Sequence, residues 1–266
     1  MGFLINRIYN EDCLQGMYKI PDKKIDCVIT SPPYNIVRSG LSDRGYDEYS
    51  DGITNEQYSN WCCQIFRVFD RILKQNGCVL WNMSYGSENT ECMPLTVSDI
   101  IRNTNFTLAD IIVWKKNAAF PNNMSSNKLT RICEFVYVFC RKDEFLSFKT
   151  NKKQVSERKT GQAAFENVFN FIEAPNNDGS TDLNKATFST NFASKLLKMY
   201  VKPFELVLDC FMGTGTTAIS CIDNNVNFIG FEISKKQCDY ANDRIKTRLA
   251  NFSMFDQVDY VEEKMI

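Results

Sequence analysis

Short, continuous apolar runs alternate with amphipathic stretches along the chain, and this pattern predicts strands that are followed by helices. The run "KIDCVIT" is typical of a buried strand that ends at Thr30. From Thr54 onward, apolar residues recur at helical spacing, and Thr54 and Gln57 have the pattern of a capping box. We expect this helix to be stopped by Gly77, and "CVLWNMS" to resume as a strand.

The second half of the chain repeats the alternation. Strands are predicted at residues 110–115, 134–141, 205–210 and 227–233, and helices are predicted to begin at Thr216 and to span 234–250. Because the strands are nearly continuous in hydrophobicity, we expect an α/β fold with a doubly wound, mostly parallel sheet and helices on both faces. The polar stretches 37–53 and 117–127 are predicted loops, and 143–184 is predicted to be an irregular insertion.

Composition excludes several kinds of chemistry. The 266 residues include eleven Cys and no His, which rules out Ser-His-Asp and Cys-His nucleophilic catalysis and any His-ligated metal. No C-x-x-C spacing indicates a zinc site, so we expect no metal, and the cysteines are interpreted as small buried residues in a reducing cytosol. No run of eighteen apolar residues is present, so we expect no membrane span or secretory signal and a cytoplasmic protein.

The charges are unevenly distributed. The net charge is only −1, but residues 115–159 contain eleven Lys or Arg and four Asp or Glu, a net charge of +7. A local basic zone on an acidic body suits a groove for a polyanion. The alternative is a solvated surface that happens to be rich in lysine.

A glycine loop follows the predicted strand 205–210. In "LVLDCFMGTGTTAIS", Asp209 ends the strand, and Gly213 and Gly215 precede a helix whose first N–H groups are free to bind a ligand. A nucleotide phosphate loop would require Gly-Lys-Ser/Thr, which is absent. A dinucleotide and S-adenosylmethionine both remain candidate ligands. The permissive G-x-G-x-x-A pattern favours a dinucleotide, whereas Asp209 suits the ammonium group of S-adenosylmethionine and Glu232 the hydroxyls of a ribose.

The loop "SPPYN" follows the strand that ends at Thr30. Its two prolines lack backbone donors, and Tyr34 presents a ring next to the hydroxyl of Ser31. A polyproline turn that simply closes the strand is the structural alternative. Because strand ends in a doubly wound sheet converge on one crevice, we expect the loops after Thr30 and Asp209 to share a site.

Together, these two loops resemble those of the amino-methylating DNA methyltransferases. That family has (D/N/S)-P-P-(Y/F) as its catalytic loop and D-x-F-x-G-x-G-T as its cofactor loop, and the order found here, catalytic loop first, is that of its β class. The resemblance touches most of the chain except 143–184. It implies a Rossmann-like fold, S-adenosylmethionine as cofactor, and methyl transfer to the exocyclic amine of a base flipped out of double-stranded DNA, without a metal. The catalytic residues that it implies are Ser31, Pro32, Pro33 and Tyr34.

The chemistry of an exocyclic amine explains these residue types. The nitrogen lone pair is delocalised into the ring, so two acceptors for its hydrogens, the Ser31 hydroxyl and the Pro32 carbonyl, would favour the reactive pyramidal form. Tyr34 offers a face on which a flipped base can stack. Methylation of a ring carbon is disfavoured, because the chain lacks the Pro-Cys pair that carries the cysteine nucleophile of that class.

The resemblance also implies a set of cofactor-binding residues: Asp12, Cys13, Thr187, Phe188, Asp209, Phe211, Gly213, Gly215, Thr216, Thr217 and Glu232. Some neighbours depart from the family pattern. Glu11 replaces a Gly, Ser189 replaces a Pro after Phe188, and Cys210 replaces the more common Pro. As alternatives, Asp12 is a turn residue, Phe188 a core aromatic and Glu232 a strand-end acid in solvent.

The first residue of the catalytic loop correlates with the target base in this family, and Ser31 favours cytosine N4, with adenine N6 as the alternative. Target choice is expected to depend on 143–184, between a catalytic half (1–142) and a cofactor-binding half (185–266), with help from the loops 117–127 and 37–53. The predicted phosphate contacts are Lys149, Lys152, Lys153, Arg158 and Lys159.

Three other functions stay open at this point. Protein-glutamine methyltransferases use a related loop but place the glycine loop first, a non-catalytic DNA-binding relative would have a damaged loop, and an NAD oxidoreductase would make "SPPYN" incidental. Under the DNA methyltransferase hypothesis, we expect a prokaryotic or phage protein that is a monomer or a homodimer. A cognate restriction endonuclease is a candidate partner.

Overall fold

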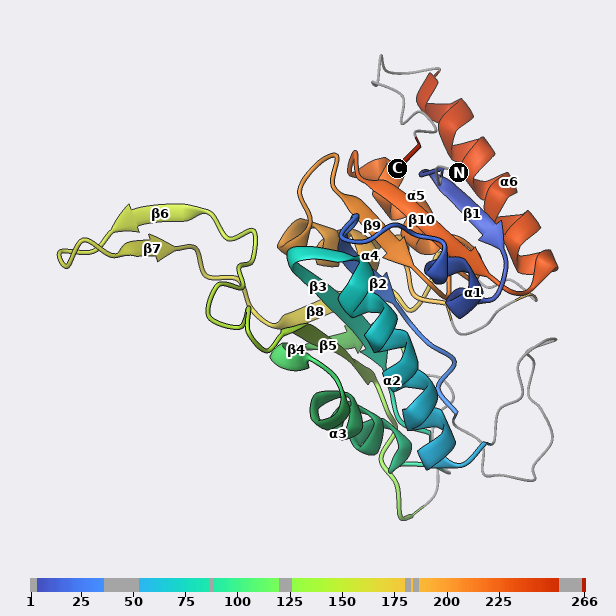
Figure 1. Ribbon diagram of the computed structural model, residues 1–266, viewed down its shortest axis with the longest axis horizontal. Coiled ribbons are helices and arrows are strands. Elements are labelled where there is room, and N and C mark those ends of the chain that lie inside the picture. The colour runs from blue at the N-terminus through green and yellow to red at the C-terminus, as the bar shows by residue number, and fades with distance from the viewer. Residues whose placement is uncertain are drawn as a thin grey trace.

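The computed structural model describes residues 4–35, 53–86, 89–119, 126–179, 183, 187–253 and 265–266. Its centre is an eight-stranded sheet in the order β1-β10-β9-β2-β3-β5-β4-β8 (Figure 1). The strands are β1 (Arg7–Asn10), β2 (Ile25–Thr30), β3 (Leu73–Met83), β4 (Phe106–Lys116), β5 (Cys133–Arg141), β8 (Phe171–Ala174), β9 (Leu206–Asp209) and β10 (Asn227–Glu232). Only β5 runs antiparallel to its neighbours, so the mostly parallel sheet is confirmed.

Helices cover both faces of the sheet. One hydrophobic core lies under α1 (Cys13–Tyr18), α2 (Asn55–Ile72) and α3 (Cys92–Asn103). The second core lies under α4 (Thr190–Tyr200), α5 (Thr216–Asp223) and α6 (Lys235–Ser253). Two apolar cores, one on each face, require strands that are hydrophobic on both sides, as the continuous apolar runs predicted. The doubly wound architecture is therefore confirmed.

The start of α2 was predicted correctly and its end was not. The Thr54 hydroxyl accepts the Gln57 N–H (3.1 Å) and the Gln57 side chain accepts the Thr54 N–H (3.1 Å), so the capping box is present. The helix ends at Ile72 rather than near Gly77, because the Ile72 carbonyl accepts the N–H of Lys24 (2.8 Å) and the chain enters the sheet at once. Gly77 lies inside β3, where an added Cβ would be 3.0 Å from the Asp26 carbonyl oxygen.

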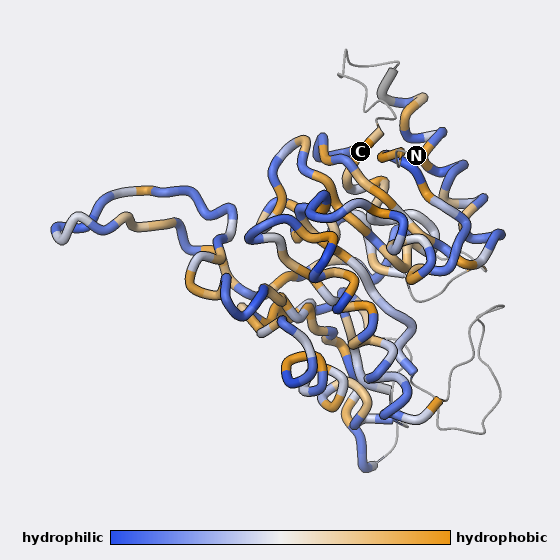
Figure 2. Tube along the Cα trace, in the orientation of Figure 1, coloured by the Kyte–Doolittle hydropathy of each residue, from blue (hydrophilic) through white to orange (hydrophobic). Residues whose placement is uncertain are grey.

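The segment 143–184 is not irregular throughout, so that prediction was wrong. It contains a hairpin of β6 (Gln154–Glu157) and β7 (Ala163–Phe165), which projects from the body, and β8, which pairs with β4 in the central sheet. Figure 2 shows the hairpin as mostly hydrophilic. The two hairpin strands are largely exposed on both faces and lack the apolar alternation that sequence patterns detect, which explains why the hairpin was missed. The hydrophobic patterns also gave no prediction of β1, α1, α3 or α4.

The topology brings the predicted loops to one edge. β2 pairs with β9 in parallel, with Cys27 opposite Val207 and Val28 opposite Leu208. β1 pairs with β10, with Asn10 opposite Glu232. The loops after these four strands therefore share the carboxyl edge of the sheet, where doubly wound proteins bind ligands. No helix in the described ranges is long and apolar enough to cross a membrane.

Candidate active site

The glycine loop has a backbone that other residues would strain. Gly213 and Gly215 have φ values of 54° and 85°, in the left-handed region. Gly215 is also the N-cap of α5, and a Cβ there would lie 2.9 Å from the Cβ of Ala241. From α6, the Arg244 guanidinium donates to the Thr214 carbonyl (2.7 Å) and holds the loop from the other side. The loop is thus fixed with its backbone close to the carboxyl edge.

Asp209 anchors this loop to the strand that carries the other motif. Its carboxylate is only 1% exposed and accepts hydrogen bonds from the Thr30 hydroxyl (2.6 Å), the Thr217 hydroxyl (2.5 Å) and the Phe211 N–H (3.0 Å). Burial raises the pKa of Asp209 to about 6, although these hydrogen bonds oppose the shift. The predicted contact of Asp209 with a cofactor ammonium stays a prediction, and the structure assigns the carboxylate a role in holding the two loops together.

Glu232 ends β10 and faces the same loop. Its carboxylate accepts the N–H of Gly213 (2.8 Å) through one oxygen and the N–H of Ser234 (2.8 Å) through the other. Its side chain is largely buried, at 8% exposure. A strand-end acid in solvent is therefore the wrong interpretation.

Asp12 and Cys13 lie directly after the strand that pairs with β10. The Asp12 carboxylate caps α1 by accepting the N–H of Gln15 (3.0 Å). Cys13 is buried, and this burial, together with the charge of Asp12, raises the pKa of its thiol to about 12, so that thiol stays protonated. Asp12 is therefore a helix cap next to Glu232, and its predicted contact with a cofactor stays a prediction.

The remaining predicted cofactor residues line the same edge. Phe188 is 8% exposed and meets Phe192 edge-to-face at 5.8 Å, so it belongs to the core of that face, and Thr187 before it is half-buried. Phe211 is half-buried against Trp61, with ring centroids 5.4 Å apart. Thr216 and Thr217 form the first turn of α5 and are buried.

The catalytic loop places two hydroxyl groups together. Ser31 Oγ and Tyr34 Oη are 2.9 Å apart. The Pro33 carbonyl accepts a hydrogen bond from the Tyr58 hydroxyl (2.7 Å), which fixes the second proline from α2. Asn35 closes the loop with a φ of 49°, and its side chain donates to the Ile53 carbonyl (3.0 Å). Ser31 and Tyr34 thus lie beside the strand end that Thr30 ties to Asp209.

Two further polar residues contact the Tyr34 hydroxyl and a third pairs with one of them, and the sequence did not indicate these three. Tyr34 donates to Glu134 Oε2 (3.1 Å) at the start of β5. The Asn82 amide on β3 donates to both Tyr34 Oη (2.9 Å) and Glu134 Oε2 (3.1 Å), and Lys116 on β4 forms an ion pair with Glu134. The only signals of these residues in the sequence were the polar Asn82 and the charged Glu134 inside otherwise apolar predicted strands.

A family model described as DNA methylase, of the N6 and N4 amino type, matches residues 25–243. The chain belongs to this DNA methylase family. It is 26% identical to the type II methyltransferase M.BglII of Bacillus subtilis (89% of this chain, 68% of the relative). It is also 27% identical to the orphan methyltransferase M.BamHII of Bacillus amyloliquefaciens (85% of this chain, 91% of the relative).

Solved structures support the fold. The PvuII DNA methyltransferase, named as cytosine-N4-specific, superposes with a TM-score of 0.69 at 16% identity and covers 94% of this chain and 93% of its own. The complex of M1.HpyAVI with SAM gives 0.58 at 22% identity, with 90% and 98% covered. The predicted methyltransferase architecture is confirmed by these matches.

The structure does not bring the five predicted phosphate contacts of this DNA methylase to the catalytic loop. Lys149, Lys152, Lys153, Arg158 and Lys159 are all exposed on or beside the β6–β7 hairpin. Within the described ranges, no hydrogen bond or ion pair joins them to residues 31–35. In Figure 1 the hairpin projects to the left, whereas β1 ends at the right of the molecule. Lys115 and Lys116, by contrast, end β4 at the carboxyl edge. The basic zone of residues 115–159 is therefore divided between this edge and the hairpin.

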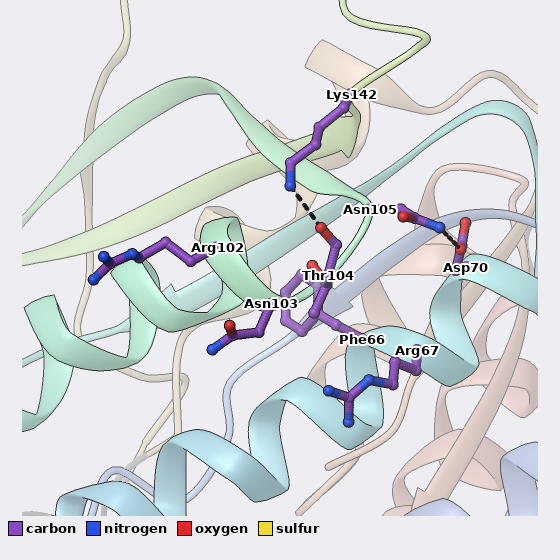
Figure 3. A pocket seen from close by; sticks show the side chains of 8 residues that line it. All are labelled: Phe66, Arg67, Asp70, Arg102, Asn103, Thr104, Asn105 and Lys142. Carbon is purple, nitrogen blue, oxygen red and sulfur yellow. Dashed lines mark hydrogen bonds between the residues drawn. The ribbon is translucent and has the colours of Figure 1, made fainter.

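A cavity of about 510 Å³ lies at the other edge of the sheet (Figure 3). Arg67 and Asp70 near the end of α2, Arg102 of α3 and Lys142 after β5 line it. Parallel strands β3 and β4 begin there, so the cavity is at the end of the sheet opposite the catalytic loop. It is not part of the candidate site. In the described part of the chain, no three Cys, Asp or Glu side chains are grouped to hold a metal.

Proposed function

We propose that this DNA methylase transfers a methyl group from S-adenosylmethionine to the exocyclic amine of a base in double-stranded DNA, with cytosine N4 as the target. The observation that carries the proposal is the direct link between the two loops. The Thr30 hydroxyl, one residue before Ser31, donates to the Asp209 carboxylate at the start of the glycine loop. A methyl donor bound to one loop and an amine bound to the other would therefore meet at one edge.

The groups along this edge fit S-adenosylmethionine. The two glycines with positive φ let the backbone approach a ligand, and the carboxylate of Glu232 suits the hydroxyls of a ribose. Phe188 and Phe211 offer apolar surface for a purine, and the other residues proposed to bind the cofactor are those named from the sequence. When bound, this cofactor would supply an electrophilic methyl group. The M1.HpyAVI structure, which has the same fold, contains SAM.

The hydroxyl of Ser31 favours cytosine over adenine as the target. In the amino-methylating family, Ser at this position is usual for cytosine N4 and Asp or Asn for adenine N6. The PvuII enzyme, with the same fold, is named as cytosine-N4-specific. Adenine N6 is the second candidate, because both amines have a delocalised lone pair and undergo the same reaction.

Segment 143–184 is proposed to contribute to target recognition. Its hairpin carries Arg158 and Lys159, and Lys152 and Lys153 lie directly before β6. Positive charge on a projecting arm suits the phosphates of DNA beyond the base pocket. The carboxyl edge carries the second part of the basic zone.

Transfer of label from tritiated S-adenosylmethionine to mixed-sequence DNA tests the proposal. After digestion to deoxynucleosides, we expect the label in N4-methyl-2′-deoxycytidine. Label in N6-methyl-2′-deoxyadenosine would contradict the choice of base, and the absence of label in DNA would contradict the proposed function. Ser31→Ala and Tyr34→Ala should abolish the signal. Ser194→Ala and Tyr18→Ala are matched controls, because Ser194 on α4 bonds Asn224 at the end of α5 and Tyr18 is 64% exposed at the end of α1.

A further inference from the structure

Four adjacent strands each place one polar residue in a row at the carboxyl edge. In the order of the sheet, Ser31 follows β2, Asn82 lies near the end of β3, Glu134 is near the start of β5 and Lys116 ends β4. Because β5 is antiparallel, its start lies at the edge where the others end. Strand pairing therefore brings together residues that are far apart in the sequence.

The hydrogen bonds along this row have one consistent direction. The Tyr34 hydroxyl donates to Glu134 Oε2, so its oxygen accepts the hydrogen of Ser31. The Asn82 amide donates to both Tyr34 and Glu134 and holds them in place. The Asn82 amide also lies 3.5 Å from Ser31 Oγ as a long hydrogen-bond donor, so the Ser31 oxygen keeps one lone pair for a hydrogen from outside the row.

Two features of this row reduce the stability of the fold, and packing gives no reason for their presence. The Asn82 side chain is 3% exposed, and its Oδ1 has no hydrogen-bond partner among the described residues. An unpartnered buried carbonyl destabilises the fold, because it loses its hydrogen bonds with water and gains none in return. Glu134 is a largely buried carboxylate whose charge is matched by Lys116. Polar residues in an otherwise apolar layer, arranged around the catalytic loop, indicate a chemical role.

Amine methylation creates a proton that must leave the site. The nitrogen lone pair forms the new N–C bond while the methyl carbon separates from the donor sulfur, which keeps the electron pair of that bond. As this bond forms, positive charge develops on the nitrogen, and one of its two hydrogens must leave as a proton while the methyl group is transferred. The chain has no His, so no imidazole can accept this hydrogen.

We infer that Ser31, Tyr34 and Glu134 form a proton relay from the base pocket to the carboxylate that is paired with Lys116. This inference rests on the proposed function. The amine hydrogen passes to Ser31 Oγ, the Ser31 hydrogen to Tyr34 Oη, and the Tyr34 hydrogen to Glu134 Oε2. Glu134 becomes a neutral acid and then releases the proton to water. Asn82 is a positioning residue that keeps Tyr34 and Glu134 aligned.

The first test is the variant Glu134→Gln, studied by single-turnover transfer of tritiated methyl groups with both substrates saturating. A relay that removes a proton in the transition state contributes roughly 10²-fold or more, so the rate should fall by at least that factor. The affinities for DNA and for S-adenosylhomocysteine, measured by calorimetry, should stay within about twofold of the wild type. Asp26→Asn is the matched control: it removes a similarly buried carboxylate paired with Lys74, near the start of β2 and outside the row.

A solvent isotope effect separates a relay from a structural role. The groups that face Glu134 are Lys116 of β4, Asn82 of β3 and Tyr34 of the catalytic loop. Single-turnover transfer by the wild type should be slower in D2O than in water, and Glu134→Gln should lack this slowing. An unchanged slowing in the variant would overturn the relay.

Tyr34→Phe keeps the ring and removes only the bridging hydroxyl, so it tests the relay even if Glu134→Gln fails to fold. Because both changes interrupt one path, the double variant should be no slower than the slower single variant. Losses that multiply would contradict the relay. If the wild type methylates DNA and both single variants match its rate, only the relay is wrong. If the wild type transfers no label to DNA, the proposed function itself fails.

Discussion

Asp209 shows how one buried carboxyl group links stability to pH. Its pKa rises from an ordinary value of 3.8 to about 6 because burial disfavours the charged form. A raised pKa means that the folded protein binds this proton more tightly than the unfolded chain does. The stability that Asp209 contributes is therefore fully present below about pH 4 and is lost as the pH rises through about 6.

Asp209→Asn should remove this dependence. The Asn carbonyl can still accept from Thr30 and from the Phe211 N–H, so we expect the variant to fold. Between about pH 4 and pH 7, its free energy of unfolding should rise relative to the wild type by about 3 kcal/mol, the value that corresponds to the pKa difference. Urea unfolding of both proteins across this range measures the effect. Parallel stability curves would show that the carboxyl group titrates normally.

Position 215 is where the glycine loop most clearly excludes any side chain. Gly215→Ala should destabilise the protein by about 1–2 kcal/mol, because φ is 85° and the new Cβ would meet Ala241 at 2.9 Å. It should also weaken S-adenosylhomocysteine binding by roughly tenfold or more. Calorimetry measures the binding, and urea unfolding measures the stability.

Gly161→Ala is the matched control for this prediction. Gly161 has a φ of 78° in the hairpin turn, and a Cβ there would come no closer than 3.8 Å to Glu157. The control should show the backbone strain without any loss of cofactor binding. Equal losses of binding in the two variants would contradict the role of the glycine loop.

Sequence reasoning located those site residues that are contiguous in the chain. Ser31, Tyr34, Asp209 and Gly215 lie in two short motifs whose residue types are tied to a chemistry. Glu134 is 100 residues from Tyr34, and strand pairing alone makes them neighbours. No local pattern contains that information. The burial of Asp209 was also not predictable, because it depends on which helices cover the strand end.

At the scale of elements, local signals predicted starts better than ends. The capping box fixed the beginning of α2, because both of its hydrogen bonds lie within four residues. The end of α2 depended on a long-range bond between Lys24 and Ile72. The direction of β5 is likewise set by its pairing with β3 and β4 rather than by its own apolar pattern.

We predict that substitutions in the β6–β7 hairpin and the residues beside it lower the affinity for DNA without changing the stability of the fold. Neutralising Lys152, Lys153, Arg158 and Lys159 to Ala should weaken DNA binding roughly 10- to 100-fold at low salt. It should also reduce the slope of log K against log salt by about 3–4, the value for four phosphate contacts. All four side chains are exposed, so thermal unfolding should not change. Fluorescence anisotropy over a salt series is the measurement.

A second quadruple variant tests whether the loss of net charge alone explains the weaker DNA binding. Lys23, Lys24, Lys198 and Lys202 are also exposed, and they lie near the start of β2 and the end of α4, away from the catalytic loop. Replacing these four by Ala changes the charge equally and should leave the salt slope as it is. If both quadruple variants lose the same affinity, the hairpin has no specific role.

At the scale of the whole molecule, the two sequence motifs belong to one cooperative unit. The predicted halves 1–142 and 185–266 meet in the middle of the sheet, where β2 of the first half pairs with β9 of the second. Thr30 and Asp209 then join the two loops by a buried hydrogen bond. The predicted recognition segment is also attached to this unit, because β8 pairs with β4. Neither half has a complete sheet of its own.

We therefore predict a single unfolding transition that the cofactor product shifts as a whole. A ligand that binds only the folded state at about one hundred times its Kd adds about 2.7 kcal/mol of stability. For a domain of this size, that corresponds to a rise in Tm of roughly 5–10 °C. Scanning calorimetry with and without S-adenosylhomocysteine measures it. Two transitions, of which the ligand shifts only the later one, would show that the halves fold separately. A single transition that does not move would instead show that the carboxyl edge does not bind this ligand.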